Sequence, residues 1–479
     1  MDVRGTPGAP VSSLRAAARD ISNRELVRYV LRTPASERAM ARAERVMPMG
    51  VASSFQFYEP HPLVMRSASG SRMQDIDGYE YVDFTLGYGA LFTGHSHPAL
   101  CRAVTEQLGR GTLFVSPCED TALAADMLAA RFGLPQWRFT NSGTEATMDA
   151  LRLARGVTGR SRIVKVEGGY HGHHDAVLVS TKPPAEAAGA PDAPVPVASS
   201  EGLPHGVLAD TIVVPYNDLD ALERVLAPRD VACFIVEPVM ENIGICLPVP
   251  GYLETVRDLT RRAGTLLLFD EVKTGITAGW HGAAGMFGIV PDLVTVGKSI
   301  GGGLPVAAFG GSSDCMDAVT TGRVLHVGTY NGNPLCMAAV RSVLGDICTP
   351  EETARVIERN RRFAADHQAA LAARGMPAHV VECGAKGCVT WAPSRIRNYR
   401  DYLETDFDLA FAQWIWGVNR GVLLPPGLDD QWLVSVAHTE DDLSLALDVF
   451  TSFLDAVADP SRAVDAGDDS LAITPGRGI

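Results

Sequence analysis

The chain has 479 residues, of which 46% are hydrophobic, enough for a large core and two or three domains. Its formal net charge of −14 argues against nucleic acid or an anionic membrane as the main partner, because both attract basic proteins. We find no apolar run near the ~20 residues of a membrane span and no signal-peptide pattern at the start, so we expect a soluble cytoplasmic protein. The nine scattered cysteines fit reduced thiols.

The first part of the chain predicts a helix and a small group of strands. Residues 1–20 are rich in small residues and read as a flexible tail, and residues 23–46 have helical spacing. An Asp77-Gly78 pair predicts a hairpin turn among three strands, which we place at Val64–Ser69, Arg72–Asp75 and Tyr81–Phe84. We assign residues 21–94 to a region that joins the smaller domain.

From residue 95 to 345, apolar strands alternate with helical stretches, a pattern typical of an α/β fold with a mostly parallel sheet. We predict strands at Trp137–Thr140, Arg162–Val166, Ala176–Val179, Thr211–Val214, Ala232–Val236, Thr265–Phe269, Leu293–Val296 and Ala307–Gly310. The long Pro- and Ala-rich stretch 180–206 has no periodicity, as in many lids.

Residues 346–459 predict a smaller α+β domain. A charged amphipathic helix covers 350–375, short strands follow near Val389–Trp391 and Trp432–Val436, and a last helix covers Asp441–Val457. Residues 460–479 read as a second flexible tail.

An acid and a lysine follow two of the predicted strands. Asp270 ends the first strand, and Lys298 follows the second among the glycines Gly297 and Gly301–Gly303. The carboxyl ends of parallel strands form ligand sites. Pyridoxal phosphate chemistry requires such a pair, because a lysine forms a Schiff base with the cofactor while a carboxylate keeps the pyridinium nitrogen protonated. The alternative is a surface lysine near an unrelated acid.

Two polar turns could bind a phosphate. Asn141–Ala146 follows a strand and opens a helix, where backbone N–H groups and small hydroxyl side chains favour an anion. Thr329 lies in a polar turn before another helix. On local grounds each could equally be a plain helix cap.

The main histidine cluster, Tyr170–Asp175, could indicate a metal. It lacks the usual ligand spacing, as do Cys383 and Cys388, so we predict no metal site. An aromatic residue at Tyr170 could instead stack on a flat cofactor ring. Glu237 ends another strand, and Asn242 follows it by five residues.

Together these motifs resemble the class III, fold-type I, pyridoxal-phosphate aminotransferases, and among them most closely the glutamate-1-semialdehyde 2,1-aminomutase branch. The resemblance covers about residues 40–455 and rests on the segments NSGTEA, YHGH, EPVMEN, FDEVKTG, GKSIGGGLP and GTYNGNP in this order. It implies a large domain with a mostly parallel sheet, a smaller α+β domain and an obligate homodimer with shared active sites.

The resemblance also implies a role for each matched residue. Lys298 would be the Schiff-base lysine and move the substrate proton, and Asp270 would pair with the pyridinium nitrogen. Tyr170 and Val272 would lie on opposite faces of the ring. The remaining cofactor contacts would be Ser142, Gly143 and Thr144 to the phosphate, Thr329 to the phosphate of the neighbouring subunit, Asn242 near the phenolic oxygen, and Glu237 in support.

The departures from the family pattern concern the substrate. The aminomutase has an arginine in its N-terminal loop that binds the substrate carboxylate, and our alignment places Gln56 there, with Ser53 retained. Glutamine cannot supply a charged bidentate clamp. Tyr88 takes an aromatic position of the family, and the family's late glutamate aligns near Asp430.

We therefore predict a ping-pong aminotransferase that moves an amino group from a donor such as L-glutamate to a keto acceptor, less charged or ring-bearing, of specialised metabolism. The aromatic run Phe55, Phe57 and Tyr58 favours such an acceptor. A glutamate-1-semialdehyde aminomutase, a racemase or epimerase, and a decarboxylating aminotransferase share the same Lys–Asp core and stay open. A non-enzymatic cofactor-binding regulator and a structural protein without cofactor are the alternatives from other classes.

Overall fold

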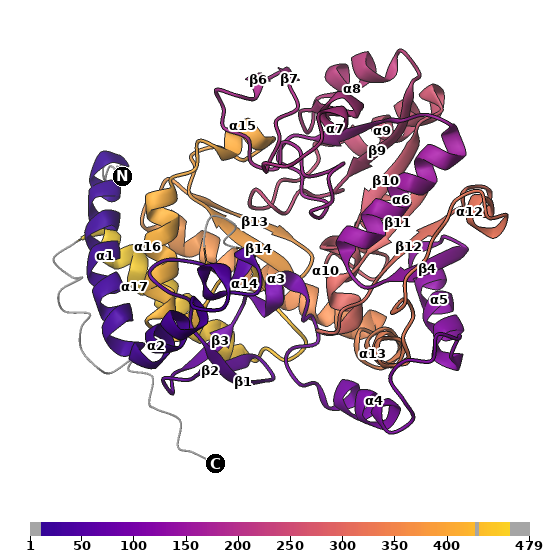
Figure 1. The fold of residues 1–479 in the computed structure, drawn as a ribbon. Helices are drawn as coiled ribbons and strands as arrows, with labels where there is room; N and C mark the ends of the chain where they lie inside the picture. The colour runs from indigo at the N-terminus through magenta and orange to yellow at the C-terminus, as the bar shows by residue number, and fades with distance from the viewer. Residues whose placement is uncertain (1–10, 427–430, 460–479) are drawn as a thin grey trace.

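The computed structural model describes residues 11–426 and 431–459. Its centre is a seven-stranded sheet in the order β4-β12-β11-β10-β9-β5-β8 (Figure 1). Strand β12 is antiparallel to both of its neighbours and the other pairs are parallel, so the predicted mostly parallel sheet is confirmed. The strands are β4 Gln136–Thr140, β5 Arg162–Val166, β8 Thr211–Val214, β9 Val231–Val236, β10 Leu266–Asp270, β11 Leu293–Val296 and β12 Ala307–Gly311.

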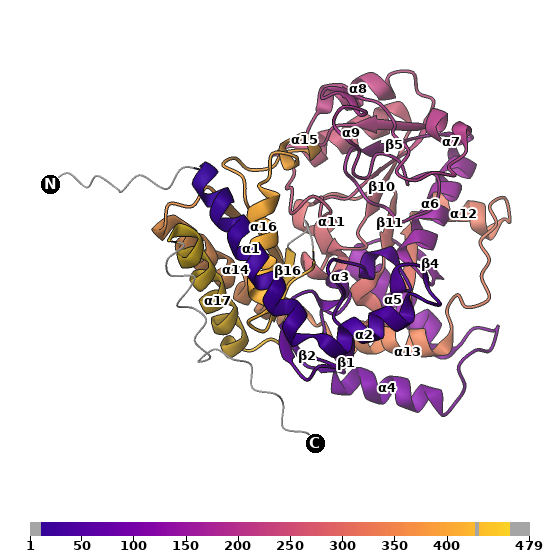
Figure 2. The same ribbon diagram turned by 60° about the vertical axis from the view of Figure 1, so that its left-hand side comes forward.

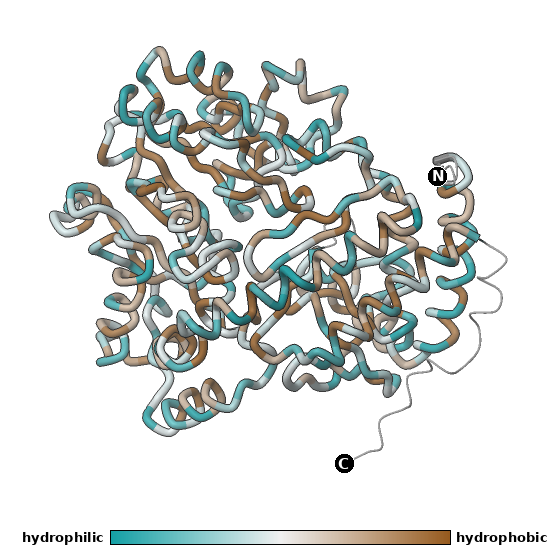
Figure 3. The backbone as a smooth tube through the Cα atoms, turned by 180° about the vertical axis from the view of Figure 1, so that it is seen from behind, coloured by the Kyte–Doolittle hydropathy of each residue, from teal (hydrophilic) through white to brown (hydrophobic). Residues whose placement is uncertain are grey.

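Helices cover both faces of this sheet, which explains why its strands read as continuous apolar runs. Phe234 of β9 belongs to one buried cluster with Val256 of helix α9. Its neighbour Cys233 belongs to a second cluster with Leu151 of helix α6. The helices are α4 Pro98–Leu108, α5 Glu119–Phe132, α6 Gly143–Thr158, α7 His205–Asp210, α8 Leu219–Leu226, α9 Tyr252–Ala263, α10 Thr274–Thr277, α11 Gly282–Phe287, α12 Ser313–Thr320 and α13 Pro334–Ser342. Figure 3 shows hydrophobic colour gathered on the inner segments.

A smaller part is built from both ends of the described chain (Figure 2). One sheet has the order β1-β2-β3-β15 and another the order β13-β14-β16. The strands are β1 Met65–Ser69, β2 Arg72–Asp75, β3 Glu80–Asp83, β13 His379–Cys383, β14 Lys386–Thr390, β15 Val422–Leu423 and β16 Gln431–Leu433. The helices are α1 Val11–Arg32, α2 Pro34–Ala43, α14 Pro350–Ala373, α15 Tyr399–Tyr402, α16 Phe407–Val418 and α17 Glu440–Ala458. We propose that the large domain ends at residue 345 and that the smaller C-terminal domain begins at residue 346.

Short helical turns join these elements: η1 Pro48–Gly50, η2 Ser54–Gln56, α3 Leu86–Gly89, η3 Lys298–Gly301 and the π-helical turn η4 Val343–Ile347. No helix within residues 11–426 and 431–459 is both long and apolar enough to cross a membrane.

The prediction of a flexible tail over residues 1–20 is wrong for residues 11–20. Helix α1 begins at Val11, and its residues Leu14 and Ala18 are buried in the main core. Arg15 forms an ion pair with Asp406 at 2.5 Å. Tertiary packing therefore stabilises a stretch whose composition resembles a tail. The helix predicted within residues 23–46 is in fact divided at Pro34, because proline has no N–H to continue the first helix and is well tolerated at the start of the second.

The strand predicted at Ala176–Val179 is also wrong. The backbone N–H groups of Val177 and Leu178 both donate to the carbonyl of His174, which closes a turn. Val177 and Val179 are nevertheless fully buried. Burial against a neighbouring helix gives the same apolar pattern as a short buried strand, so the pattern alone could not separate the two.

The 180–206 segment is held by the smaller part of the molecule. It contains the short strands β6 Gly189–Ala190 and β7 Ala193–Pro194. Arg400 forms a bidentate ion pair with Glu167, both bonds 2.8 Å long, and also donates to the carbonyls of Ala185 and Ala188. Tyr399 Oη donates to the carbonyl of Pro183 at 2.9 Å.

The packing of α1 predicts that its buried face contributes to stability. Leu14→Ala should lower the free energy of unfolding by about 2–5 kcal/mol, because it leaves a cavity at a site that is 2% exposed. Leu31→Ala, on the same helix at a site 76% exposed, should change it by less than about 0.5 kcal/mol. Urea unfolding of both variants checks this, and equal midpoints would contradict the packed position of α1.

Candidate active site

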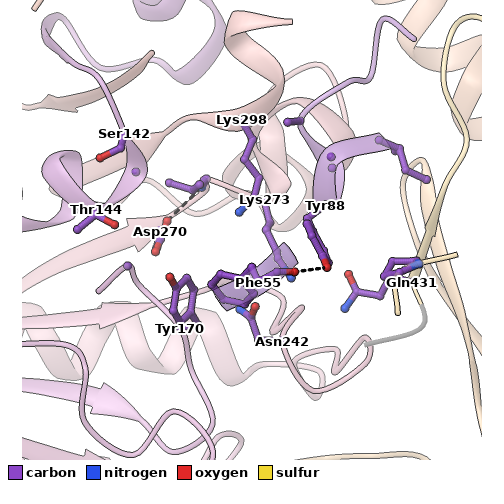
Figure 4. A pocket seen from close by; sticks show the side chains of 18 of the residues that line it. Phe55, Tyr88, Ser142, Thr144, Tyr170, Asn242, Asp270, Lys273, Lys298 and Gln431 are labelled. Carbon is purple, nitrogen blue, oxygen red and sulfur yellow. Dashed lines mark hydrogen bonds between the residues drawn. The ribbon is translucent and has the colours of Figure 1, made fainter. Parts of the chain in front are cut away.

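One cavity of about 460 Å³ lies at the carboxyl ends of the central strands, between the large sheet and the smaller part (Figure 4). Its wall brings together most of the residues that the sequence singled out, from segments more than 200 residues apart. These are Tyr88, Ser142, Gly143, Thr144, Tyr170, Glu237, Asn242, Asp270, Val272 and Lys298.

Lys298 enters the cavity directly after β11, at the start of turn η3. Its φ angle of 48° lies in the left-handed region, which is costly for a residue with a side chain and is found where the surrounding fold imposes it. Burial lowers the pKa of its ammonium group to about 7, and the positive charges of Lys273 and Lys386 act in the same direction. A large share of neutral amine is therefore present near neutral pH.

Asp270 ends the neighbouring strand β10, where it lies beside Thr295 of β11. Its Oδ1 accepts hydrogen bonds from Thr295 Oγ1 and from the Val272 N–H, both 3.1 Å long. Its Oδ2 lies 2.8 Å from His171 Nδ1. These three contacts fix the carboxylate at the end of the sheet, where it can face a ring nitrogen.

Glu237 fixes the next part of the wall. Both of its carboxylate oxygens accept from Asn242 Nδ2, at 3.0 and 3.1 Å. Its Oε1 also accepts from the Tyr170 N–H at 3.1 Å, which places the tyrosine ring. Burial raises the pKa of the Glu237 carboxyl.

The N-terminus of α6 also lines the cavity, and it presents small residues there. Ser142 caps the helix, with its Oγ accepting from the Glu145 N–H at 3.2 Å. A Cβ atom at Gly143 would lie 3.0 Å from Val272, and one at Gly172 would lie 2.6 Å from Thr144 Oγ1. Because these two glycines have no side chain, the neighbouring segments pack closely, and the N–H groups and hydroxyls at this helix end can bind an anion. A basic amine, a fixed carboxylate and an anion-binding helix end fit pyridoxal phosphate.

The wall also contains residues that were not predicted as site residues, among them Phe55, Lys273, Lys386 and Gln431. The Phe55 ring lies 5.7 Å from the ring of Tyr170 and 6.1 Å from that of Tyr88. Phe55 belongs to the aromatic run of the N-terminal loop, and Lys273 directly follows Val272, so both carry a local signal in the sequence. Lys386 and Gln431 had none.

Four predicted residues are not placed in the wall. Gln56 is exposed, and its Oε1 accepts from the Ala52 N–H at 3.2 Å within the same loop. Ser53 and Thr329 are also exposed and do not line the cavity. Asp430 lies outside the described residues, while the adjacent Gln431 lines the cavity.

The histidine cluster takes part in the site through His171, which we had not predicted as the partner of Asp270. His174 lies 3.3 Å from Thr147 Oγ1, and burial lowers its pKa to about 4. Within the described parts of the chain, no three His, Cys, Asp or Glu side chains are grouped so that they could hold a metal ion.

The lowered pKa of Lys298 predicts how the apoprotein captures its cofactor. Only the neutral amine attacks an aldehyde, so the rate of reaction with pyridoxal phosphate should rise through pH ~7 and level off above it, whereas an ordinary lysine would rise towards pH ~10. Stopped-flow absorbance between pH 6 and 10 checks this. A rate that still climbs at pH 10 would contradict the assigned environment.

Comparison with known proteins agrees with this site. Residues 56–395 match the family model described as aminotransferase class-III. Glutamate-1-semialdehyde 2,1-aminomutase 2 of Brevibacillus brevis is 38% identical over 423 residues, which cover 86% of this chain and 96% of that protein. The crystal structure of a glutamate-1-semialdehyde-aminomutase from Pseudomonas aeruginosa PAO1 is 32% identical with a TM-score of 0.85, covering 92% of this chain and 99% of that one. An omega-transaminase from Sphaerobacter thermophilus is 33% identical with a TM-score of 0.84, covering 89% of this chain and 99% of that one.

The predicted resemblance and fold-type I architecture are confirmed, and the chain belongs to the class-III aminotransferase family.

Proposed function

We propose that this chain is an aminotransferase that moves an amino group from an amino-acid donor, L-glutamate, to a separate keto acceptor that carries a ring. The observation that carries this proposal is the composition of the cavity wall. It contains Phe55 in ring contact with both Tyr88 and Tyr170, and no arginine among its described residues. An aromatic wall favours a flat, weakly charged acceptor.

The cofactor is pyridoxal 5′-phosphate, which supplies an electron sink for the bond-breaking at the substrate carbon. With the cofactor bound, Lys298 would hold it covalently, and after displacement by the donor amine the free Lys298 amine would take the proton from the substrate carbon and return it at the cofactor's C4′. Its lowered pKa suits it to accept a proton near neutral pH. Donor and acceptor use the same cavity in turn, so the kinetics are ping-pong.

The other wall residues position the ring. Asp270 would face the ring nitrogen and keep it protonated, while Val272 and Tyr170 would enclose the two ring faces. Asn242, oriented by Glu237, would lie by the phenolic oxygen, and Ser142, Gly143 and Thr144 would bind the phosphate. These assignments draw on the contacts described above together with the family resemblance.

A second candidate is a glutamate-1-semialdehyde aminomutase, which returns the amino group to the same molecule. The comparisons favour it, because curated relatives at about 38% identity carry that name. The loop favours transfer to a second molecule, because Gln56 stands where the resemblance places the carboxylate-binding arginine of the aminomutases, and its side chain accepts from its own loop and does not line the cavity. A racemase would share the same core and is separated from both by the products.

We also infer a cytoplasmic homodimer with shared active sites. Thr329, which the resemblance assigns to the partner's phosphate, is exposed and stands between Val327 and Tyr330, 72% and 61% exposed. Large apolar side chains exposed in one segment favour burial against a second copy.

The role of Asp270 predicts a large loss of turnover in Asp270→Ala, by several orders of magnitude, because a neutral pyridine is a poor electron sink. Thr295→Val is the matched control: it keeps the carboxylate, removes one 3.1 Å hydrogen bond and should cost at most about tenfold. Steady-state rates with cofactor loading measured by absorbance check both. Turnover in Asp270→Ala within tenfold of the parent would refute the assignment.

The two candidate functions differ in their response to glutamate-1-semialdehyde. We expect little conversion to 5-aminolevulinate, since the aminomutase clamp is absent from the Gln56 loop. Restoring a cation through Gln56→Arg should not create the activity, because this side chain faces its own loop. Efficient conversion by the parent protein would reject transfer to a second molecule and establish the aminomutase.

A further inference from the structure

Gln431 presents a buried amide to the cavity. It begins strand β16, where it lies opposite Cys388 of β14, and it is only 8% exposed although it lines the cavity wall. Glutamine is seldom buried to this extent, because its amide must then find hydrogen-bond partners away from water. The nitrogen and the oxygen of this amide have different surroundings, and the difference bears on the ligand.

The nitrogen of the amide is held by the main chain. Gln431 Nε2 donates to the carbonyl of Glu241 at 2.6 Å and also to the carbonyl of Gly244. A carbonyl oxygen only accepts hydrogen bonds, so these two contacts identify which end of the amide is the nitrogen. Both N–H donors of the amide are thereby used. The side chain is fixed in one orientation, with its oxygen on the other side of the planar group.

The oxygen of the amide opens into the cavity. Among the described residues none donates a hydrogen bond to Gln431 Oε1, yet this atom is not sealed inside the protein. The rest of the side chain is buried, so the surface that the oxygen exposes faces the cavity. Figure 4 shows the amide end of Gln431 directed toward the side on which Tyr88 and Phe55 lie. A fixed acceptor thus stands at the wall, ready for a donor from a ligand.

Two donor groups of the same wall are directed to other acceptors. Tyr88 Oη donates to the carbonyl of Phe55 at 3.0 Å, and Trp432 Nε1 donates to Asn360 Oδ1 at 2.7 Å. The partner of Gln431 Oε1 is therefore either water or a group of the substrate. When a substrate displaces that water without supplying a donor, the oxygen is left unpaired, which is unfavourable.

The chemistry of an amide oxygen limits which substrate group can take the place of water. The oxygen only accepts, so the group must carry an O–H or N–H, and a carboxylate or an ether oxygen has none. An ammonium group would lose more hydration on burial than one bond to a neutral oxygen returns. A hydroxyl group is the smallest neutral donor, and it is compatible with a ring that packs on Phe55 and Tyr88.

We propose that Gln431 is a specificity-determining residue whose Oε1 accepts a hydrogen bond from a hydroxyl group on the ring-bearing acceptor. The inference rests on the proposed function, and it narrows the acceptor to a ketone whose ring carries a hydroxyl. The ring packs on Phe55 and Tyr88, and the hydroxyl reaches Gln431. The alternative is that water satisfies Oε1 and that Gln431 only ties β16 to the carbonyls of Glu241 and Gly244.

The test compares Gln431→Met with Gln413→Met, a matched control. Gln413 is 7% exposed and does not line the cavity, and its Oε1 accepts from Trp391 Nε1 at 2.8 Å. Each variant loses one buried amide, but only the first changes the wall. If Gln431→Met does not fold, Gln431→Lys replaces it, because an ammonium group keeps donors for the Glu241 and Gly244 carbonyls and offers no acceptor.

Two readouts are taken on the holoenzyme, each with a hydroxyl probe and its methyl ether. The ether keeps the ring and the oxygen but has no donor. The first readout is the dissociation constant, by calorimetry, of p-cresol against 4-methylanisole and of cyclohexanol against methoxycyclohexane. The second is the concentration of tyramine, against 4-methoxyphenethylamine, that half-saturates the loss of cofactor absorbance at about 420 nm in a single turnover. These amines probe the acceptor's site because amino transfer is reversible.

The parent protein should prefer the hydroxyl probe of at least one ring type by about tenfold to a hundredfold, and tyramine by a similar factor. In Gln431→Met the preference should fall to within about twofold, while Gln413→Met should keep it. A purely structural role of Gln431 would weaken hydroxyl and ether probes alike and leave their ratio unchanged. The comparison of p-cresol with cyclohexanol shows whether the hydroxyl belongs to an aromatic or a saturated ring.

The outcomes separate this inference from the proposed function. Equal binding of hydroxyl and ether probes by the parent, or a preference that persists in Gln431→Met, overturns the hydroxyl site even if the parent transfers amino groups. Failure of every probe to bind the parent also overturns it. If tyramine leaves the cofactor absorbance unchanged while the preference for p-cresol or cyclohexanol depends on Gln431, the hydroxyl site stands and the proposed transfer to a ring-bearing acceptor is wrong.

Discussion

The structure depends on the pairing of two neighbouring parallel strands, β10 and β11. Their register places Asp270 beside Thr295, and Thr295 Oγ1 donates to the Asp270 carboxylate. Lys298 follows Thr295 by three residues, so one pair of strands sets both the acid and the amine. The apolar residues that drive the strands together therefore also fix the distance between the two groups, before any loop contributes.

Around this pair, several buried polar groups are held by contacts that also shape the cavity. Glu237 orients the Asn242 amide and the Tyr170 backbone, while His171 and Val272 reach Asp270 from two sides. Such networks are stable only when their members are satisfied. These contacts fix the part of the cavity wall that the strand ends form, whereas Phe55 reaches the wall from the loop before β1.

The proposed cofactor end could be predicted from the sequence because its residues stand at strand ends or helix starts with recognisable motifs, and nine of those predicted residues line the cavity. The substrate end could not. Loop residues 51–58 have no periodicity, so nothing in the sequence showed that Phe55 rather than Gln56 enters the cavity. Lys386 meets Glu241 across 145 residues, a contact that local patterns do not encode. Helix α1 was missed because its stability comes from packing on α16 rather than from its own composition.

The central claim is that the chain transfers an amino group to its cofactor and then releases the donor as a keto acid. The most direct measurement is an absorbance scan of the holoenzyme before and after L-glutamate without acceptor, with 2-oxoglutarate quantified per active site. The account predicts a band near ~420 nm that shifts to ~330 nm with about one 2-oxoglutarate per site. A cofactor band that does not move, with no 2-oxoglutarate released, would contradict it.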